Sequence, residues 1–267
     1  MKVYVSADIE GIAGIAAWDE ADPSKPDYAE LRKRMTDHVA AGCEGAVMAG
    51  ATEILVKDAH AAGRNIVFDR LPREAKLVRG WSQHPLFMVQ ELDGSFDAMV
   101  MIGYHDRAGG GGNPLAHTFS NRAVARMTIN GLPVSEFHLY LYAGAMLGVP
   151  VVFVSGDEAT CAMATEANAS IRTVAALRGI GASTVSIHPD VIEDRIRAGV
   201  REACRADASA CAIELPDRFT LELRFKEAAR AYRASHYPGV SVVDDTTVRF
   251  EATEYGEVLR ALMFIVY

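Results

Sequence analysis

Cysteine is scarce in this sequence, which has four in 267 residues, and no two of them form a Cys-x-x-Cys pair. A chain of this length that is half hydrophobic can bury a large core without covalent cross-links. We therefore expect buried free thiols rather than disulfides or a thiolate metal site, and a reducing, cytoplasmic location. The four residues are Cys43, Cys161, Cys204 and Cys211.

Clusters of basic residues and long apolar runs are also missing. The formal net charge is −8, and we find no extended cluster of Lys and Arg residues. Because nucleic acids and anionic membrane surfaces are bound by clustered positive charge, we expect neither as a partner. No run of about 18 uncharged apolar residues occurs, and residues 1–15 lack the basic start and apolar run of a secretory signal.

What the sequence does contain is an alternation of short apolar runs and amphipathic stretches. A stripe of apolar residues at spacings near four predicts a helix over about 28–49, between two apolar runs. A strand, a helix and a second strand form a βαβ unit, whose strands are parallel. We expect an α/β fold with a largely parallel sheet flanked by helices. The apolar runs that we interpret as buried strands are 3–5, 52–57, 97–102 and 150–154.

Beyond about residue 158 the alternation loosens, which favours a smaller C-terminal lobe of α/β or α+β type. We expect a metal-bearing α/β domain over 1–157 and this lobe over 158–267, with one compact unit as the alternative. Further helices are expected over 135–147, 158–169, 190–205 and 255–264, with a short one over 85–92. Further extended segments are expected at 66–68, 77–78, 115–119, 123–129, 173–177, 219–225 and 246–251.

Side chains that can bind a cation follow three of the apolar runs. Asp8 and Glu10 follow the first run, His60 follows the second, and His105 follows the third. The carboxyl ends of parallel strands share one edge of a sheet, so these groups should meet there. Each residue alone is better explained by an ordinary structural role, as an exposed carboxylate, a capped turn or a histidine bonded to a backbone carbonyl. Together they predict a metal site, and carboxylate and imidazole ligands suit Zn²⁺, Mn²⁺ or Co²⁺.

Several polar residues near these runs have ordinary structural explanations. His117 reads as a loop residue, and Glu136 as an acid in the first turn of a helix. Asp157 is expected to cap a helix. Asp58 is expected to orient a metal-ligating side chain without itself binding the metal. The four glycines at 109–112 form a loop that is either mobile or brings its backbone close to another group. Structural roles are expected for His38, His84, His138, His188 and His236.

Five segments of the chain form an ordered set of motifs: SADIEGIAG at 6–14, VKDAH at 56–60, GYHDRA at 103–108, AHTFSN at 116–121 and VSEFHLYLY at 134–142. In order and spacing this set resembles the DppA-type D-aminopeptidases, a family of zinc peptidases. The resemblance covers most of the chain through about residue 165 and is weaker toward the C-terminus. The glycine-rich loop at 109–112 departs from the family pattern, which leaves the substrate preference open.

The resemblance assigns roles to the candidate residues. It implies that His117 is the family's nucleophilic histidine and that five residues are zinc ligands. The implied ligands are Asp8, Glu10, His60, His105 and Glu136. We expect two zinc ions per subunit, with Asp8 as the bridging carboxylate. Direct attack of an imidazole on an amide needs an acyl intermediate that is difficult to form, so we favour His117 as a proton shuttle.

The expected activity is that of a zinc metallo-aminopeptidase. It would hydrolyse the N-terminal residue of short peptides or amino-acid amides, of D type by the resemblance, with a metal-activated water molecule. The resemblance also implies a ring-shaped homo-oligomer, a decamer. The alternatives are a metal-dependent amidase or phosphoesterase with the same ligands, and a protein that binds a metal or ligand without turnover.

Overall fold

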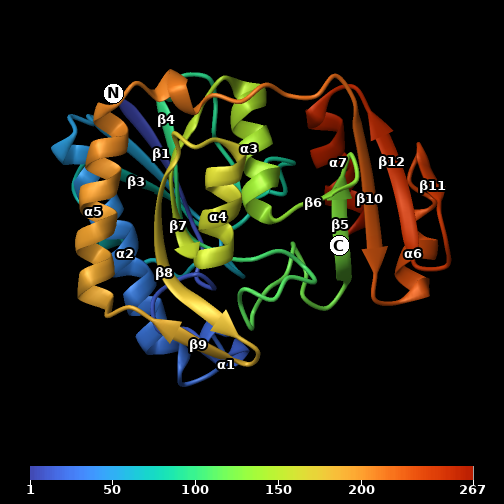
Figure 1. Cartoon of the computed structure of the whole chain (residues 1–267), viewed down its shortest axis with the longest axis horizontal. Helices are drawn as coiled ribbons and strands as arrows, with labels where there is room; N and C mark the ends of the chain where they lie inside the picture. The colour runs from blue at the N-terminus through green and yellow to red at the C-terminus, as the bar shows by residue number, and fades with distance from the viewer. Residues whose placement is uncertain (267) are drawn as a thin grey trace.

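The computed structural model describes residues 1–266, which form two β-sheets with helices around them (Figure 1). The larger sheet has the strand order β3-β2-β1-β4-β7-β8-β9. All neighbouring strands in it are parallel except β8 and β9. Its strands are β1 (Lys2–Ala7), β2 (Glu53–Asp58), β3 (Ala75–Val78), β4 (Ala98–Tyr104), β7 (Val151–Asp157), β8 (Arg172–Ile180) and β9 (Ser183–Ser186).

The smaller sheet is antiparallel and has the order β11-β12-β10-β5-β6. Strands from both sides of residue 157 contribute to each sheet, and the division into two domains at that residue stays a prediction. A hairpin turn at Asn130-Gly131 joins β5 to β6, and both residues have positive φ, as a tight hairpin turn requires. The strands are β5 (Val124–Ile129), β6 (Leu132–Pro133), β10 (Phe219–Phe225), β11 (Val240–Val242) and β12 (Thr247–Ala252).

Helices cover both faces of the larger sheet, as expected for parallel strands (Figure 1). Helices α2 and α5 pack together on one face, and α3 and α4 lie on the other. Helix α7 contacts both α3 and the smaller sheet. Its Tyr255 donates a hydrogen bond to the carbonyl of Leu139 in α3 at 2.7 Å. The helices are α1 (Trp18–Ala21), α2 (Tyr28–Met48), α3 (Glu136–Leu147), α4 (Glu158–Ala167), α5 (Pro189–Arg205), α6 (Ala228–Ala234) and α7 (Tyr255–Ile265), with short 3₁₀ turns η1 (Phe68–Arg70), η2 (Phe87–Val89) and η3 (Ala208–Cys211).

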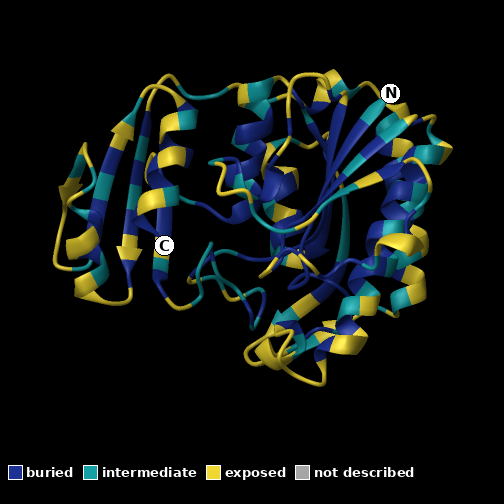
Figure 2. Ribbon diagram, turned by 180° about the vertical axis from the view of Figure 1, so that it is seen from behind, coloured by how far each residue is buried: buried dark blue, intermediate teal, exposed yellow. Residues whose placement is uncertain are grey.

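The strands of the larger sheet that bring the site together are buried along most of their length, as Figure 2 shows in dark blue. Strands β4 and β7 are buried at every residue, which explains why both appear in the sequence as continuous apolar runs. Cys43, Cys161 and Cys211 are buried free thiols, and Cys204 is a half-buried one, which agrees with the expectation. Among the helices of residues 1–266, none combines the length and apolarity needed to cross a bilayer.

The sequence-based expectations failed in segments that are short or exposed. The extended segment expected at 66–68 is wrong, because a 3₁₀ turn begins at Phe68. The helix expected over 85–92 is reduced to η2. Residues 115–119 form a loop rather than a strand. Elements β9, β11 and α6 were not expected. Exposed edge strands and a seven-residue helix with two buried alanines leave little apolar periodicity in the sequence.

One buried charge in β2 is unusual. The side chain of Lys57 is inaccessible to solvent, and its Nζ donates hydrogen bonds to the carbonyls of Asp58 at 2.8 Å and Gly80 at 2.6 Å. Nζ also lies 4.0 Å from the centre of the Trp81 ring. Burial lowers the pKa of Lys57 to about 8, although the charge of Asp58 opposes this shift. The fold therefore carries the cost of burying a charged ammonium at neutral pH.

We predict that the Lys57→Met variant removes a pH-dependent part of the stability. Between about pH 8 and 10.5 the unfolded chain keeps a proton on Lys57 that the folded chain has lost, so the burial cost is relieved as the pH rises. The free energy of unfolding of the wild type, relative to that of the variant, should rise by up to about 3 kcal/mol between pH 7 and 11. Urea titrations measure this difference. The exposed Lys76→Met variant serves as control, and a Lys57→Met difference that stays constant with pH would contradict the prediction.

Candidate metal centre

Three adjacent strands end in the residues that the sequence singled out. Strand β1 lies between β2 and β4, parallel to both, so the carboxyl ends of the three strands lie side by side. Asp8 and Glu10 lie just beyond β1, His60 beyond β2 and His105 beyond β4. All four residues are buried. The predicted convergence of groups about fifty residues apart in the chain is therefore observed at this edge of the sheet.

The first group of donors consists of Asp8, Glu10 and His60. The Nδ1 atom of His60 lies 3.1 Å from Glu10 Oε2 and 3.3 Å from Asp8 Oδ1. On the other side of the ring, Nε2 donates a hydrogen bond to the carbonyl of Ala21 at 2.7 Å. That bond fixes the ring, and it leaves Nδ1 available to face the two carboxylates.

The second group is built around His105. Its Nε2 lies 3.4 Å from Asp8 Oδ2 and 3.4 Å from Glu136 Oε2, while Nδ1 donates to the carbonyl of Asp106 at 2.9 Å. Glu136 is the first residue of α3, and its Oε1 accepts a hydrogen bond from the backbone N–H of Phe119 at 2.7 Å. Helix α3 therefore aims a carboxylate at the strand ends, which the helix-start interpretation of Glu136 did not anticipate.

Asp8 connects the two groups. Its Oδ1 faces His60 and its Oδ2 faces His105, so the two oxygens of one carboxylate are directed at two different imidazoles. The backbone N–H of Ile9 donates to Oδ1 at 2.9 Å and helps to hold this orientation. A carboxylate in this position has the geometry needed to bridge two cations.

His117 approaches the second group from the loop before β5. Its Nε2 lies 3.9 Å from Glu136 Oε1, and its ring stacks on that of His105 with centroids 4.2 Å apart. The Trp18 and His117 rings form an edge contact with their centroids 5.2 Å apart. Its Nδ1 donates to the carbonyl of Leu115 at 2.9 Å, so Nε2 is the atom directed at the cluster. The His117 side chain is 13% exposed, the largest fraction among the six clustered residues.

The charges of the cluster depend on one another. Burial raises the pKa of Asp8, but the close imidazoles of His105 and His60 outweigh burial and hold it well below its usual value. Burial lowers the pKa of His60 and of His105, but Glu10, Asp8 and Glu136 outweigh burial and hold both pKa values well above normal. Three buried carboxylates thus require positive charge between them, which protonated imidazoles or bound cations can provide.

The donor set fits divalent metal ions. Two ligands bonded to one tetrahedral Zn²⁺ at about 2.0–2.2 Å lie about 3.3–3.6 Å apart, and the carboxylate–imidazole distances around His60 and His105 are 3.1–3.4 Å. The buried Nε2 of His105 lies 3.4 Å from both Asp8 Oδ2 and Glu136 Oε2 and forms no well-aligned hydrogen bond with either, so it is placed to bind a metal ion that these carboxylates share. Within the described residues there are two such groups of three donors, Asp8 with Glu10 and His60, and His105 with His117 and Glu136.

A buried network behind the cluster holds two of its segments in place. Asp157 caps α4, as expected, by accepting the backbone N–H of Thr160 at 2.7 Å. Its other oxygen accepts the N–H of Asp106 at 2.7 Å and the side-chain amide of Asn113 at 3.0 Å. The same amide nitrogen of Asn113 donates to the carbonyl of Glu10 at 2.8 Å. One carboxylate therefore connects the segments that carry Glu10 and His105, and no sequence motif indicated a role for Asn113.

The glycine-rich loop at 109–112 brings its backbone close to another group, which is one of the two explanations that the sequence allowed for it. Gly112 N–H donates to Asp106 Oδ2 at 2.9 Å. A Cβ atom at Gly110 would overlap the Asp106 carboxylate, and one at Gly112 would overlap Ala159. The loop therefore wraps around Asp106, and Gly110 and Gly112 are needed because no side chain fits at these two positions.

Asp58 stabilises the backbone around His60 rather than the imidazole ring, because its carboxylate bonds to Asn65 and Ile66. Its carboxylate accepts the N–H of Ile66 and the side-chain amide of Asn65, at 2.8 and 2.7 Å. The Asn65 amide also donates to the carbonyl of His60 at 2.7 Å. Asp58 thus fixes the turn after β2 through Asn65, which is an indirect form of the expected role.

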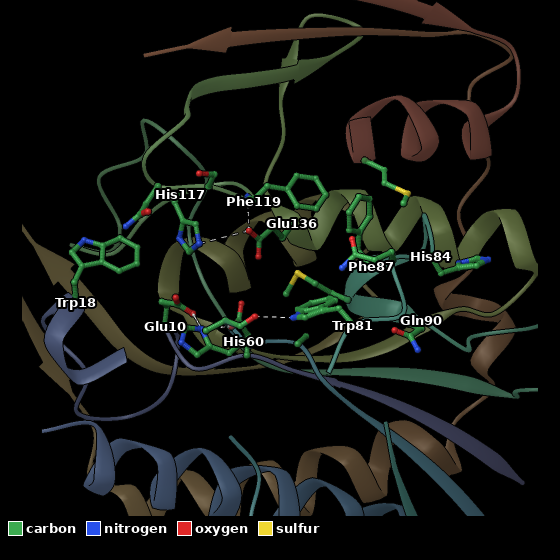
Figure 3. A pocket seen from close by; sticks show the side chains of 18 residues that line it. Glu10, Trp18, His60, Trp81, His84, Phe87, Gln90, His117, Phe119 and Glu136 are labelled. Carbon is green, nitrogen blue, oxygen red and sulfur yellow. Dashed lines mark hydrogen bonds and ion pairs between the residues drawn. The ribbon is translucent and has the colours of Figure 1, made fainter. Parts of the chain in front are cut away.

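The cluster of carboxylates and imidazoles forms one side of a cavity of about 440 Å³ (Figure 3). In Figure 3, Glu10, His60, Glu136 and His117 lie together, with Trp18 beyond His117. Trp81, Phe87 and Phe119 lie on the other side of Glu136. His84, for which a structural role was expected, also lines this cavity. A cavity of this size and mixed polarity suits a small organic ligand next to the cluster.

Comparisons with known proteins give one consistent result. The family model described as D-aminopeptidase matches residues 1–264. A D-aminopeptidase of Bacillus subtilis (strain 168) is 31% identical over 265 residues, which cover 98% of this chain and 96% of that protein. Among solved structures, the zinc-dependent D-aminopeptidase DppA from Bacillus subtilis, described as a self-compartmentalizing protease, superposes with a TM-score of 0.93. It is 29% identical, and the match covers 99% of this chain and 96% of that one.

We predict that divalent metal stabilises the fold through Asp8. Ions that bind only the folded chain stabilise it by about 2.7 kcal/mol when their free concentration is 100 times Kd. Zinc should therefore raise the unfolding temperature of chelator-treated wild type, and Asp8→Ala should lose most of this increase, because Asp8 faces both histidines. Calorimetry with elemental analysis measures both effects. Glu166→Gln, on the exposed side of α4, is the matched control, and an Asp8→Ala variant that binds zinc like wild type would refute the assignment.

Proposed function

Since the chain belongs to the D-aminopeptidase family, we propose that it is a zinc-dependent aminopeptidase that removes the N-terminal D-residue from short peptides or amino-acid amides. The observation that carries the proposal is the pair of donor groups joined by Asp8, which opens into the cavity beside a partly exposed imidazole. A purely structural metal site would bury all its donors and leave no room for a substrate.

We propose five ligands for two zinc ions. Asp8 is the bridging ligand, Glu10 and His60 complete one site, and His105 and Glu136 complete the other. Bound zinc would lower the pKa of a water molecule to about 7 and polarise the carbonyl of the scissile amide. The carbonyls of Ala21 and Asp106 hold the ring nitrogens that face away from the ions, so both imidazoles are oriented before metal binds.

His117 is the proposed acid and base. Its Nδ1 is held by Leu115, so Nε2 can accept a proton from the attacking water and deliver it to the leaving amine. The rings of His105 and Trp18 both contact it and limit its movement. His117 belongs to one of the two donor groups, yet its 3.9 Å separation from Glu136 and its greater exposure favour a role toward substrate. A nucleophilic role, which the family resemblance implies, uses the same atom.

We also propose that the protein assembles into a ring-shaped homo-oligomer, a decamer by the resemblance. The supporting observation is a set of exposed apolar residues in or near the smaller sheet, Leu132, Tyr232, Val242 and Phe264. Such side chains are commonly buried between subunits. Light scattering of the purified protein should give a mass several times that of one chain, and a monomer at micromolar concentration would contradict this part of the proposal.

The rival functions are a metal-dependent amidase or phosphoesterase and a binding protein without turnover. Zinc-loaded protein should be assayed on D-Ala-D-Ala, L-Ala-L-Ala, D-Ala amide and p-nitrophenyl phosphate. The proposal expects release of D-Ala from the D-peptide or its amide. Hydrolysis of the phosphate ester alone would favour the phosphoesterase, and bound zinc with every substrate intact would favour the binding protein.

We predict that His117→Ala lowers kcat on D-Ala-D-Ala by about 10²–10⁴-fold, the range for loss of a positioned acid or base. The zinc content should stay that of wild type, because the five proposed ligands remain. Steady-state kinetics and elemental analysis give the two values. His188→Ala, an exposed histidine at the start of α5, is the matched control. Loss of zinc together with activity would instead make His117 a ligand.

A further inference from the structure

An aromatic wall lines the cavity on the side away from His117. It consists of Trp81, Phe87 and Phe119, and in Figure 3 these side chains and His117 lie on opposite sides of Glu136. The Phe87 and Phe119 rings contact each other with centroids 5.0 Å apart and planes inclined by 57°. Met88 and Met263 add further apolar surface to the same cavity. The cavity therefore has a charged side at the cluster and an apolar side at the wall.

The backbone of the wall is held in a rare conformation. Phe87 has φ of 44° and Phe119 has φ of 60°, in the left-handed region that bulky side chains seldom adopt. Six non-glycine residues among residues 1–266 have positive φ, and four of these six line the cavity. These four are Phe87, Phe119, Ala61 and Gln83. Unfavourable backbone conformations persist where the surroundings enforce them, and they gather at functional sites.

Contacts behind the wall fix it in place. The indole N–H of Trp81 donates to the carbonyl of Ala61 at 2.7 Å, in the turn that carries His60. Lys57 Nζ lies 4.0 Å from the centre of the Trp81 ring and holds the Gly80 carbonyl at 2.6 Å. The backbone N–H of Phe119 is bonded to Glu136. Two of the three aromatic residues are thus fixed relative to the metal ligands, and Phe119 contacts the third.

The position of His117 indicates which part of a substrate meets the wall. If His117 protonates the leaving amine, the departing part of the peptide lies on the His117 side of the cluster. The N-terminal residue then lies on the opposite side of the scissile carbonyl, toward Trp81, Phe87 and Phe119. A D-Ala side chain is a single methyl group, which is far too small to cover three aromatic rings.

We propose that Trp81, Phe87 and Phe119 form the specificity site for the side chain of the N-terminal residue, and that this residue is large and apolar. The proposal rests on the aminopeptidase function proposed above and narrows its substrate class. Burial of a large apolar side chain against the wall is expected to raise kcat/KM roughly 10- to 100-fold over that for an N-terminal D-Ala. Because the wall is rigid, little ordering of the protein opposes this gain.

The test compares three dipeptides with the zinc-loaded enzyme: D-Phe-D-Ala, D-Ala-D-Ala and D-Ala-D-Phe. Wild type should prefer D-Phe-D-Ala by at least tenfold in kcat/KM, mainly through a lower KM. Phe87→Ala should reduce the ratio of kcat/KM for D-Phe-D-Ala to that for D-Ala-D-Ala at least fivefold, and Phe87→Leu should reduce it less, because Leu keeps part of the apolar surface. Phe68→Ala removes an exposed aromatic residue outside the cavity and should leave the ratio unchanged.

The outcomes separate this inference from the proposed function. If no D-peptide is hydrolysed, the aminopeptidase function itself fails. If D-Ala-D-Ala is hydrolysed and D-Phe-D-Ala is no better, or if the ratio is the same in Phe87→Ala, the specificity site is refuted while the function stands. A preference for D-Ala-D-Phe over D-Phe-D-Ala would refute the assignment to the N-terminal residue. Zinc content and circular dichroism of each variant establish that it folds and binds metal.

Discussion

The site depends on one buried carboxylate that faces two imidazoles from different strands. Asp8 Oδ1 lies 3.3 Å from His60 and Oδ2 lies 3.4 Å from His105. With Glu10 and Glu136 close by, the cluster holds three carboxylates out of water, and such an arrangement is stable only with compensating positive charge. Binding of divalent ions at the proposed site would therefore be coupled to the local fold, because the ions would take over the compensating charge that protonated imidazoles otherwise provide.

Much of the surrounding structure serves to hold these donors at their positions. Each of the three clustered histidines donates one ring N–H to a backbone carbonyl, and those carbonyls belong to Ala21, Asp106 and Leu115. Asp157 in turn fixes the backbone of Asp106 and, through Asn113, that of Glu10. Backbone groups define these orientations, so the clustered side chains are arranged by the path of the chain more than by neighbouring side chains.

The same dependence on chain path explains which predictions succeeded. Helix α2 and the strands that end at the site have strong apolar periodicity or continuous apolar runs, so their positions followed from the sequence. The residues expected as ligands at three strand ends lie together, because parallel strands must present their carboxyl ends at one edge. The pairing of β5 with β10, across about ninety residues, could not be foreseen. Nothing local in either strand specifies its partner.

The sequence by itself determined the fold class, the strand-end donors Asp8, Glu10, His60 and His105, and, through ordered motifs, the family. These features depend on local periodicity and on the chemistry of residue types, both of which can be recognised in a linear string. The resemblance implied that Glu136 and His117 belong to the same site. Only the tertiary structure decided that Asn113 and Asp157 support this site and that Trp81, Phe87 and Phe119 share one wall. Those contacts depend on how loops return to the sheet, and loop paths are set by many weak interactions between residues distant in the chain.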